Sequence, residues 1–244
     1  MLRDLCGDTA MTRPAFELPI PVLPIAGDAD TVFPVKRVFC VGRNYADHIR
    51  EMGKDPERES PFFFMKPASA VVPVPHQGCV ISYPPQTHNF QHEIELVAAI
   101  GARAANVTPS EALDCIFGYA VGLDMTRRDL QLAARESGRP WEFGKSFGQS
   151  APVGAIQRTS QIGHPRAGAI WLTVNGATRQ HANLAELIWS VAECVSFLSA
   201  FDALDPGDLL FTGTPAGVGP VTVGDRIHGG IDGIGEISAH IAAG

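Results

Sequence analysis

The chain has 244 residues, of which 45% are hydrophobic and 18% are charged, and this balance excludes an intrinsically disordered chain because enough apolar surface is available to offset the entropy of ordering. The formal net charge of −7 argues against nucleic acid as a partner. No apolar run approaches the roughly 20 residues needed to cross a bilayer, so we expect no membrane partner. Five scattered cysteines without a CxxC pair predict reduced thiols in a cytoplasmic protein.

The N-terminal segment differs in composition from the rest of the chain. Residues 14–35 alternate proline with apolar residues, which predicts an extended arm over residues 1–36. No serine- or glycine-rich linker and no internal repeat interrupts residues 37–244, which we therefore expect to form a single domain.

Strand signals outnumber helix signals along this domain. The strongest is the hairpin turn Asn175-Gly176, because both of its positions require a positive φ. We expect strands at Arg37–Val41, Ile94–Ile100, Phe117–Leu123, Ala169–Val174 and Leu209–Thr212. Two further strands are expected within 221–241.

Helix starts are predicted at polar residues that are followed by an acid three positions later, namely Asn44, Thr108, Thr126 and Asn183. The clearest helix spans residues 184–201, where apolar residues recur on one stripe. Since strands are in the majority, the sequence predicts an α+β, mostly β fold with a few short helices.

Two acids at the start of the apolar strand 94–100 are the first candidates for chemistry. Glu93 and Glu95 are two residues apart, so on a strand they project from the same face with Cα atoms about 6.6 Å apart. Two such carboxylates favour a cation between them, and hard oxygen ligands suit Mg²⁺, Mn²⁺ or Ca²⁺. The alternative is that both face solvent near the end of the strand.

A third acid, Asp124, follows the apolar strand 117–123, and strand ends commonly carry functional groups. The helix expected after it places Arg128, Gln131 and Arg135 on one face. The alternative is an ordinary strand-to-helix loop with a solvated basic face.

His48 and Glu51 are three residues apart on the short helix expected after Asn44, so the carboxylate can orient the imidazole as a general base. Gly42 and Gly53 on either side suggest that residues 44–52 move as a lid. The alternative is a pair of surface side chains.

Other motifs are weak. His88 and His92 have the spacing of zinc ligands on a helix, but His92 borders a strand. The glycine-rich segment 213–219 lacks the Gly-Lys-Ser/Thr ending of a P-loop, and neither a G-x-G-x-x-G nor a G-x-S-x-G motif is present.

Taken together, seven segments resemble the fumarylacetoacetate hydrolase family, in family order across residues 37–241: VGRNYADHIREMG (41–53), FFFMKPASAVV (62–72), HEIELVAAIG (92–101), GYAVGLDMTRRDLQ (118–131), KSFGQSAPVG (145–154), WLTVNG (171–176) and LLFTGTPAGVGP (209–220). The resemblance implies a mixed β-sandwich roll of the type found in the family's C-terminal domain. It also implies a homodimer and one Mg²⁺ or Mn²⁺ per chain held by three carboxylates.

Carried onto this chain, the resemblance makes Glu93, Glu95 and Asp124 the metal ligands, and His48 and Glu51 the lid dyad. We expect this chain to lack the separate N-terminal domain of the family's tyrosine-pathway enzyme, together with the extra acidic ligand that this domain supplies.

The resemblance also assigns the groups around the substrate. Lys145 faces the substrate, and Arg128, Gln131 and Thr214 hold its pyruvyl end. Leu123 stands where many members have asparagine, and we do not expect this difference to remove the metal.

The function implied is a metal-dependent hydrolase of C–C bonds that cleaves acylpyruvates, with fumarylpyruvate from aromatic catabolism as the expected substrate. His48 would activate the attacking water and Lys145 would stabilise the oxyanion. Two alternatives are an oxaloacetate decarboxylase that uses the same metal, and a non-catalytic metal-bound scaffold. Candidates for binding a carboxylate at the far end of the substrate are Arg43, Arg50 and Arg135, which the sequence does not rank.

Overall fold

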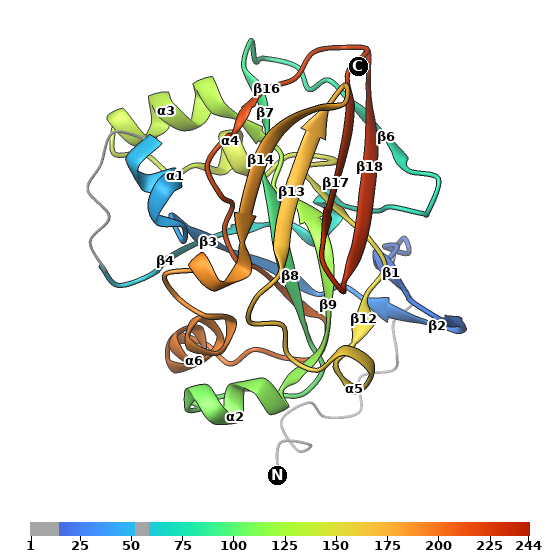
Figure 1. The fold of residues 1–244 in the computed structure, drawn as a ribbon, viewed down its shortest axis with the longest axis vertical. Coiled ribbons are helices and arrows are strands. Elements are labelled where there is room, and N and C mark those ends of the chain that lie inside the picture. The colour runs from blue at the N-terminus through green and yellow to red at the C-terminus, as the bar shows by residue number, and fades with distance from the viewer. Residues whose placement is uncertain (1–14, 52–58) are drawn as a thin grey trace.

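Two β-sheets form the body of the protein in the computed structural model, which describes residues 15–51 and 59–244 (Figure 1). The larger sheet contains, in spatial order, β4 (Phe62–Lys66), β3 (Arg37–Gly42), β15 (Asp208–Phe211), β8 (Ile94–Ile100), β9 (Ile116–Leu123), β11 (Ala151–Val153) and β5 (Val71–Pro73), and β12 (Gln157–Arg158) also pairs with β9. The second sheet contains β14 (Ala177–Asn183), β13 (Ala169–Val174), β17 (Arg226–Ile231), β18 (Gly235–Ala242) and β6 (Cys79–Ser82).

Smaller elements surround the two sheets. A three-stranded sheet contains β10 (Thr126–Arg127), β7 (Phe90–His92) and β16 (Gly219–Pro220). The helices are α1 (Ala46–Glu51), α2 (Pro109–Asp114), α3 (Arg128–Glu136), α4 (Glu142–Lys145), α5 (Thr159–Ile162) and α6 (Val191–Phe201), with 3₁₀ turns η1 (Ala68–Ala70) and η2 (Leu184–Glu186). The mostly β, α+β fold predicted from the sequence is confirmed, and no helix of the described residues is long and apolar enough to span a membrane.

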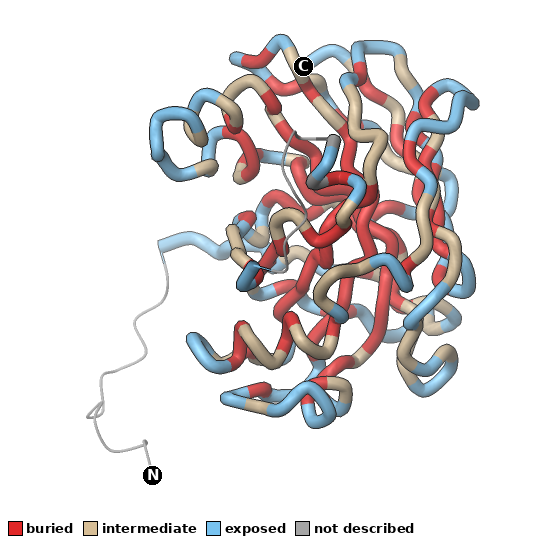
Figure 2. Tube along the Cα trace, turned by 60° about the vertical axis from the view of Figure 1, so that its left-hand side comes forward, coloured by how far each residue is buried: buried red, intermediate tan, exposed pale blue. Residues whose placement is uncertain are grey.

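The main hydrophobic core lies between the two sheets. Ile94 and Leu96 of β8 are fully buried in one cluster with Ile170 and Leu172 of β13. Because successive residues of a strand point to opposite faces, Glu95 points away from this core. Figure 2 shows the buried residues concentrated along the central strands. The two-residue alternation of β8 thus places the Glu95 side chain on the face opposite the main hydrophobic core.

Within residues 15–36, the described part of the predicted arm, the chain forms a β-hairpin. The strands β1 (Val22–Ile25) and β2 (Asp28–Pro34) pair as an antiparallel hairpin that reverses at Gly27, where φ is 72°. Leu23 and Phe33 from this hairpin are buried in a second cluster on the other face of the larger sheet. Leu23 and Phe33 therefore pack against the sheet, whereas Phe16, Leu18 and Ile20 before the hairpin are exposed.

The continuous helix predicted over residues 184–201 is wrong. Residues 184–186 form the 3₁₀ turn η2, and α6 begins only after Ser190, whose hydroxyl forms a capping box with Glu193. The backbone between them is bonded elsewhere, because the Ile188 N–H donates to the Asn44 carbonyl at 2.9 Å. The hydrogen bond to a distant segment thus interrupts the helix that the apolar periodicity predicted.

The sequence predicted that Asn44 and Thr126 cap helices, and this prediction is wrong. The amide of Asn44 donates to the carbonyls of Trp189 and Thr212, both at 2.8 Å, and its oxygen accepts from the Trp189 N–H at 2.7 Å. Thr126 lies in β10 and donates to the Asp124 carbonyl at 3.0 Å. Thr108 does form the predicted capping box, with Glu111.

Candidate active site

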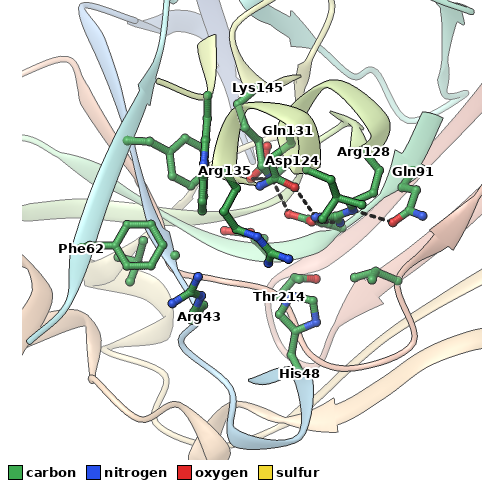
Figure 3. A pocket seen from close by; sticks show the side chains of 18 of the residues that line it. Arg43, His48, Phe62, Gln91, Asp124, Arg128, Gln131, Arg135, Lys145 and Thr214 are labelled. Carbon is green, nitrogen blue, oxygen red and sulfur yellow. Dashed lines mark hydrogen bonds and ion pairs between the residues drawn. The ribbon is translucent and has the colours of Figure 1, made fainter. Parts of the chain in front are cut away.

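A cavity of about 370 Å³ lies between the β3–α1 segment, β4, α3, α4 and the loop after β15 (Figure 3). Every predicted site residue whose side chain the structure describes lines it: His48, Glu93, Glu95, Asp124, Arg128, Gln131, Lys145 and Thr214. The Glu51 side chain lies outside the described residues, so its pairing with His48 stays a prediction. The ligand-dependent movement predicted for residues 44–52 likewise stays a prediction.

The β8–β9 ladder brings the three acids together. Ile94 pairs with Leu123 in antiparallel register, and the Asp124 N–H donates to the Glu93 carbonyl at 2.8 Å. All three carboxylates are buried, and one oxygen from each lies within 4.8 Å of the other two. The solvent-facing alternative for Glu93 and Glu95 is therefore wrong.

Buried cations neutralise two of the three carboxylates. The Lys145 ammonium lies 2.7 Å from a carboxylate oxygen of Glu93 and 2.7 Å from one of Asp124, and Arg128 also binds Glu93. Burial opposes ionisation of Glu93, but Lys145 and Arg128 outweigh it and hold the pKa of Glu93 well below its ordinary value. These two cations thus favour the ionised form of Glu93.

Glu95 is in the opposite situation. Among the described residues it forms no ion pair, and it accepts a hydrogen bond from the Gly213 N–H at 2.7 Å. Burial, reinforced by the charges of Asp124 and Glu93, raises the pKa of Glu95 well above its ordinary value. A divalent cation between the three carboxylates would relieve this repulsion, and an all-oxygen donor set suits Mg²⁺ or Mn²⁺. The residues present therefore fit such an ion.

Lys66 is a buried cation that the sequence reasoning missed. Its ammonium lies 2.8 Å from an Asp124 carboxylate oxygen and donates to the carbonyls of Met125 and Lys145. The signal was a lysine closing the apolar strand Phe62–Lys66, whose alternation places it on the same side as Phe62 and Phe64. With Lys66, three cations face three carboxylates, so an added divalent cation would leave the site positive and suited to an anionic substrate.

A buried glutamine, also missed, fixes the loop that carries Thr214. The Gln180 amide donates to the Thr214 hydroxyl and to the Pro215 carbonyl, both at 2.8 Å. Its oxygen accepts from the Ile94 N–H at 3.1 Å and lies 3.0 Å from Nδ1 of His92, which makes that nitrogen the donor. His92 thus has a structural role, and the Thr214 hydroxyl donates to the Ile94 carbonyl.

The remaining predicted groups lie around the cavity wall. The buried His48 points into the cavity from the side opposite Lys145 and Asp124 (Figure 3). Arg128 donates to Gln131 at 2.6 Å and to Gln91 at 2.8 Å. At the end of β3, a Cβ on Gly42 would lie 2.0 Å from the Phe62 ring, so any other residue at this position would displace that ring from the cavity wall.

Comparison with known proteins gives a consistent assignment. A family model described as fumarylacetoacetate hydrolase C-terminal matches residues 37–242. A crystal structure of fumarylpyruvate hydrolase from Pseudomonas aeruginosa with Mn²⁺ and pyruvate superimposes with a TM-score of 0.93 at 56% identity, covering 95% of this chain and 100% of that one.

Two curated relatives differ in their reactions. A fumarylpyruvate hydrolase of Ralstonia is 46% identical over 184 residues, which is 75% of this chain and 94% of the relative. A mitochondrial oxaloacetate tautomerase of Mus musculus is 41% identical over 199 residues, which is 82% of this chain and 88% of the relative.

Proposed function

Because the chain belongs to the fumarylacetoacetate hydrolase family, we propose that it is a Mg²⁺- or Mn²⁺-dependent hydrolase that cleaves acylpyruvates, with fumarylpyruvate as the preferred substrate. The products are pyruvate and a carboxylic acid. The observation that carries the proposal is the buried group Glu93, Glu95 and Asp124, with His48 and Lys145 lining the same cavity. One catalytic domain over residues 37–244 accounts for the activity.

The proposed metal site consists of the three carboxylates, and Glu95 supports it most strongly because no cation among the described residues neutralises this acid. A bound divalent cation would act as a Lewis acid toward the substrate's carboxylate and adjacent 2-oxo group. The Pseudomonas aeruginosa relative was crystallised with Mn²⁺ and pyruvate, which supports this assignment.

His48 acts in this proposal as the general base. It takes a proton from a water molecule whose oxygen forms the new bond to the C4 carbonyl carbon, and Glu51 orients its ring. The C3–C4 bond then breaks, its electron pair passes to C3 and the 2-oxo oxygen, and the proton returns to C3.

Lys145 stabilises the negative charge that develops on the C4 oxygen, and its contacts with Glu93 and Asp124 hold its ammonium at the cavity wall. Arg128, Gln131 and Thr214 hold the pyruvyl end. Because Arg128 is fixed by Glu93, Gln91 and Gln131, its position is set before substrate arrives.

The proposal is tested with purified protein loaded with Mg²⁺ or Mn²⁺. Fumarylpyruvate should be consumed, measured as loss of its enol absorbance, with release of one pyruvate for each substrate. Protein stripped of metal is the control and should be inactive. Absence of turnover on every acylpyruvate by metal-loaded protein would contradict the proposal and leave the metal-bound scaffold as the better interpretation.

A second candidate function is an enzyme acting on oxaloacetate, and it is favoured by the mammalian relatives named oxaloacetate tautomerase. Decarboxylation or tautomerisation of oxaloacetate needs no attacking water. Measuring pyruvate release and enol–keto conversion from oxaloacetate in the same preparation separates the candidates, because oxaloacetate should be processed more slowly than fumarylpyruvate if the first proposal holds.

We also propose that the protein is a cytoplasmic homodimer. Met65 in β4 and Phe143 in α4 are 45% and 81% exposed, and they belong to neighbouring elements beside the cavity. Exposed large apolar side chains on neighbouring elements favour a contact with another protein chain. Sedimentation analysis of the wild type and of a Phe143→Ser variant tests this, since the variant should dissociate more readily.

A further inference from the structure

Two arginines face the cavity away from the carboxylates. Arg43 follows β3, and Arg135 lies in the last turn of α3. Both line the cavity, and Figure 3 shows the Arg135 guanidinium between the acidic cluster and His48, with Arg43 to one side of it, beside Phe62. Two cations therefore face the same space from separate elements.

Neither guanidinium is neutralised by the protein around it. Within the described part of the chain, no ion pair reaches Arg43 or Arg135, and the buried Nε of Arg43 has no hydrogen-bond acceptor. Burial and the charge of Arg135 lower the pKa of Arg43, while Glu59 opposes this effect. A buried donor without an acceptor costs stability, so the arrangement favours an anion that the protein itself does not supply.

The backbone and the aromatic wall hold Arg43 in this orientation. Its φ of 59° lies in the left-handed region, which non-glycine residues adopt at a cost that is often found at functional sites. Its guanidinium carbon lies 5.3 Å from the centre of the Phe62 ring. The rings of Phe62 and Trp141, 5.4 Å apart, form an apolar wall suited to a flat, conjugated chain.

The other arginines near the cavity are already engaged. Arg50 on α1 is exposed and pairs with Asp47 at 2.5 Å. Arg128 is bound to Glu93, Gln91 and Gln131. Of the three arginines that the sequence left unranked, only Arg43 and Arg135 line the cavity.

We propose that Arg43 and Arg135 together bind a carboxylate at the far end of the substrate's acyl tail, so that the enzyme prefers acylpyruvates that end in a carboxylate over neutral ones. This inference rests on the proposed function. The cavity of about 370 Å³ is large enough for a small dioxo acid with a carboxylate at each end. Guanidinium groups suit this role because they bind carboxylates through paired, charge-assisted hydrogen bonds.

The kinetic test compares fumarylpyruvate with crotonylpyruvate, in which a methyl group replaces the terminal carboxylate. Arg135→Gln and Arg43→Gln should each lower kcat/KM for fumarylpyruvate by about 10- to 100-fold, the loss expected for a charged hydrogen bond. Neither should change kcat/KM for crotonylpyruvate by more than about threefold. Arg43→Lys, which keeps the charge, should retain part of the preference and guards against misfolding of the glutamine variant.

The matched control is Arg50→Gln, which removes an arginine on the neighbouring helix that does not line the cavity. It should leave the ratio between the two substrates as in the wild type. Equal losses on both substrates in the Arg43 and Arg135 variants, or an equal loss in Arg50→Gln, would overturn the proposal while leaving acylpyruvate hydrolysis in place.

A binding measurement separates this inference from the proposed function. In calorimetry with Mn²⁺ present, 2-oxoadipate should bind wild-type protein at least tenfold more tightly than 2-oxohexanoate, and Arg135→Gln should remove that difference. If no acylpyruvate is cleaved but this difference is found, the carboxylate subsite stands and the proposed reaction fails. If acylpyruvates are cleaved but the two ligands bind equally tightly, the carboxylate subsite is wrong and the proposed reaction stands.

Discussion

Lys66→Met tests the electrostatic balance of the acidic cluster. The Lys66 ammonium is fully buried, 2.8 Å from an Asp124 oxygen, and methionine keeps much of its apolar stem. Breaking a buried ion pair by removing one partner typically costs about 3–5 kcal/mol. Because Lys145 remains 2.7 Å from the other Asp124 oxygen, we expect a loss near the lower limit, about 3 kcal/mol in metal-free protein.

The assay is urea unfolding of the metal-free wild type and of the metal-free variant. The unfolding midpoints are compared for curves in which the free energy of unfolding depends equally steeply on urea concentration. Lys36→Met is the matched control, because Lys36 lies 2.7 Å from Asp205 but its side chain is 53% exposed. An exposed pair of this kind contributes up to about 1 kcal/mol. Saturating Mn²⁺ should reduce the difference in unfolding free energy between wild type and Lys66→Met, since the ion replaces the missing positive charge. Equal unfolding midpoints for the Lys66 variant and wild type, or for the two variants, would refute the reasoning.

Three further predictions concern the metal, the base and the lid. Glu95→Ala should keep the fold but lose Mn²⁺ affinity in calorimetry, whereas Glu236→Ala, on the exposed face of β18, should bind Mn²⁺ as the wild type does. His48→Ala should lower kcat on fumarylpyruvate by about 10²–10⁴-fold, and Glu51→Gln should lower it by less. Any decarboxylation of oxaloacetate should be less affected in both variants. A wild-type kcat for His48→Ala on fumarylpyruvate would show that the base is misassigned. Backbone amides of residues 44–52 should exchange more slowly with oxalate bound, and identical exchange in both states would speak against a lid.

The part of the site that sequence reasoning could predict depends on local periodicity. Glu93 and Glu95 share a face because of the two-residue repeat of a strand, and β8 has the predicted bounds, Ile94–Ile100. Asp124 follows β9, whose end the sequence also placed correctly. These features need only the neighbouring residues to be known.

The part that could not be predicted depends on contacts between distant segments. Lys66 reaches Asp124 only because β3 and β4 pair and bring β4 beside the cavity. The break after residue 186 arises because the Ile188 N–H bonds to Asn44, far away in the chain. The segment 62–66 indicates only that Lys66 shares a face with Phe62 and Phe64, and it does not indicate the partner Asp124. Nothing around Ile188 indicates its bond to Asn44, so hydrophobic periodicity alone favoured a continuous helix.

The buried amide of Asn44 has a consequence for the order of events during a catalytic cycle. Its bonds to Trp189 and Thr212 fasten the chain to the body of the protein immediately before α1. Any swing of α1 must therefore begin beyond this anchor, so His48 can travel while Arg43, on the other side of it, stays in place. In the proposed mechanism, the substrate is therefore bound at both ends before His48 reaches it, which makes substrate binding a separate step that precedes bond cleavage.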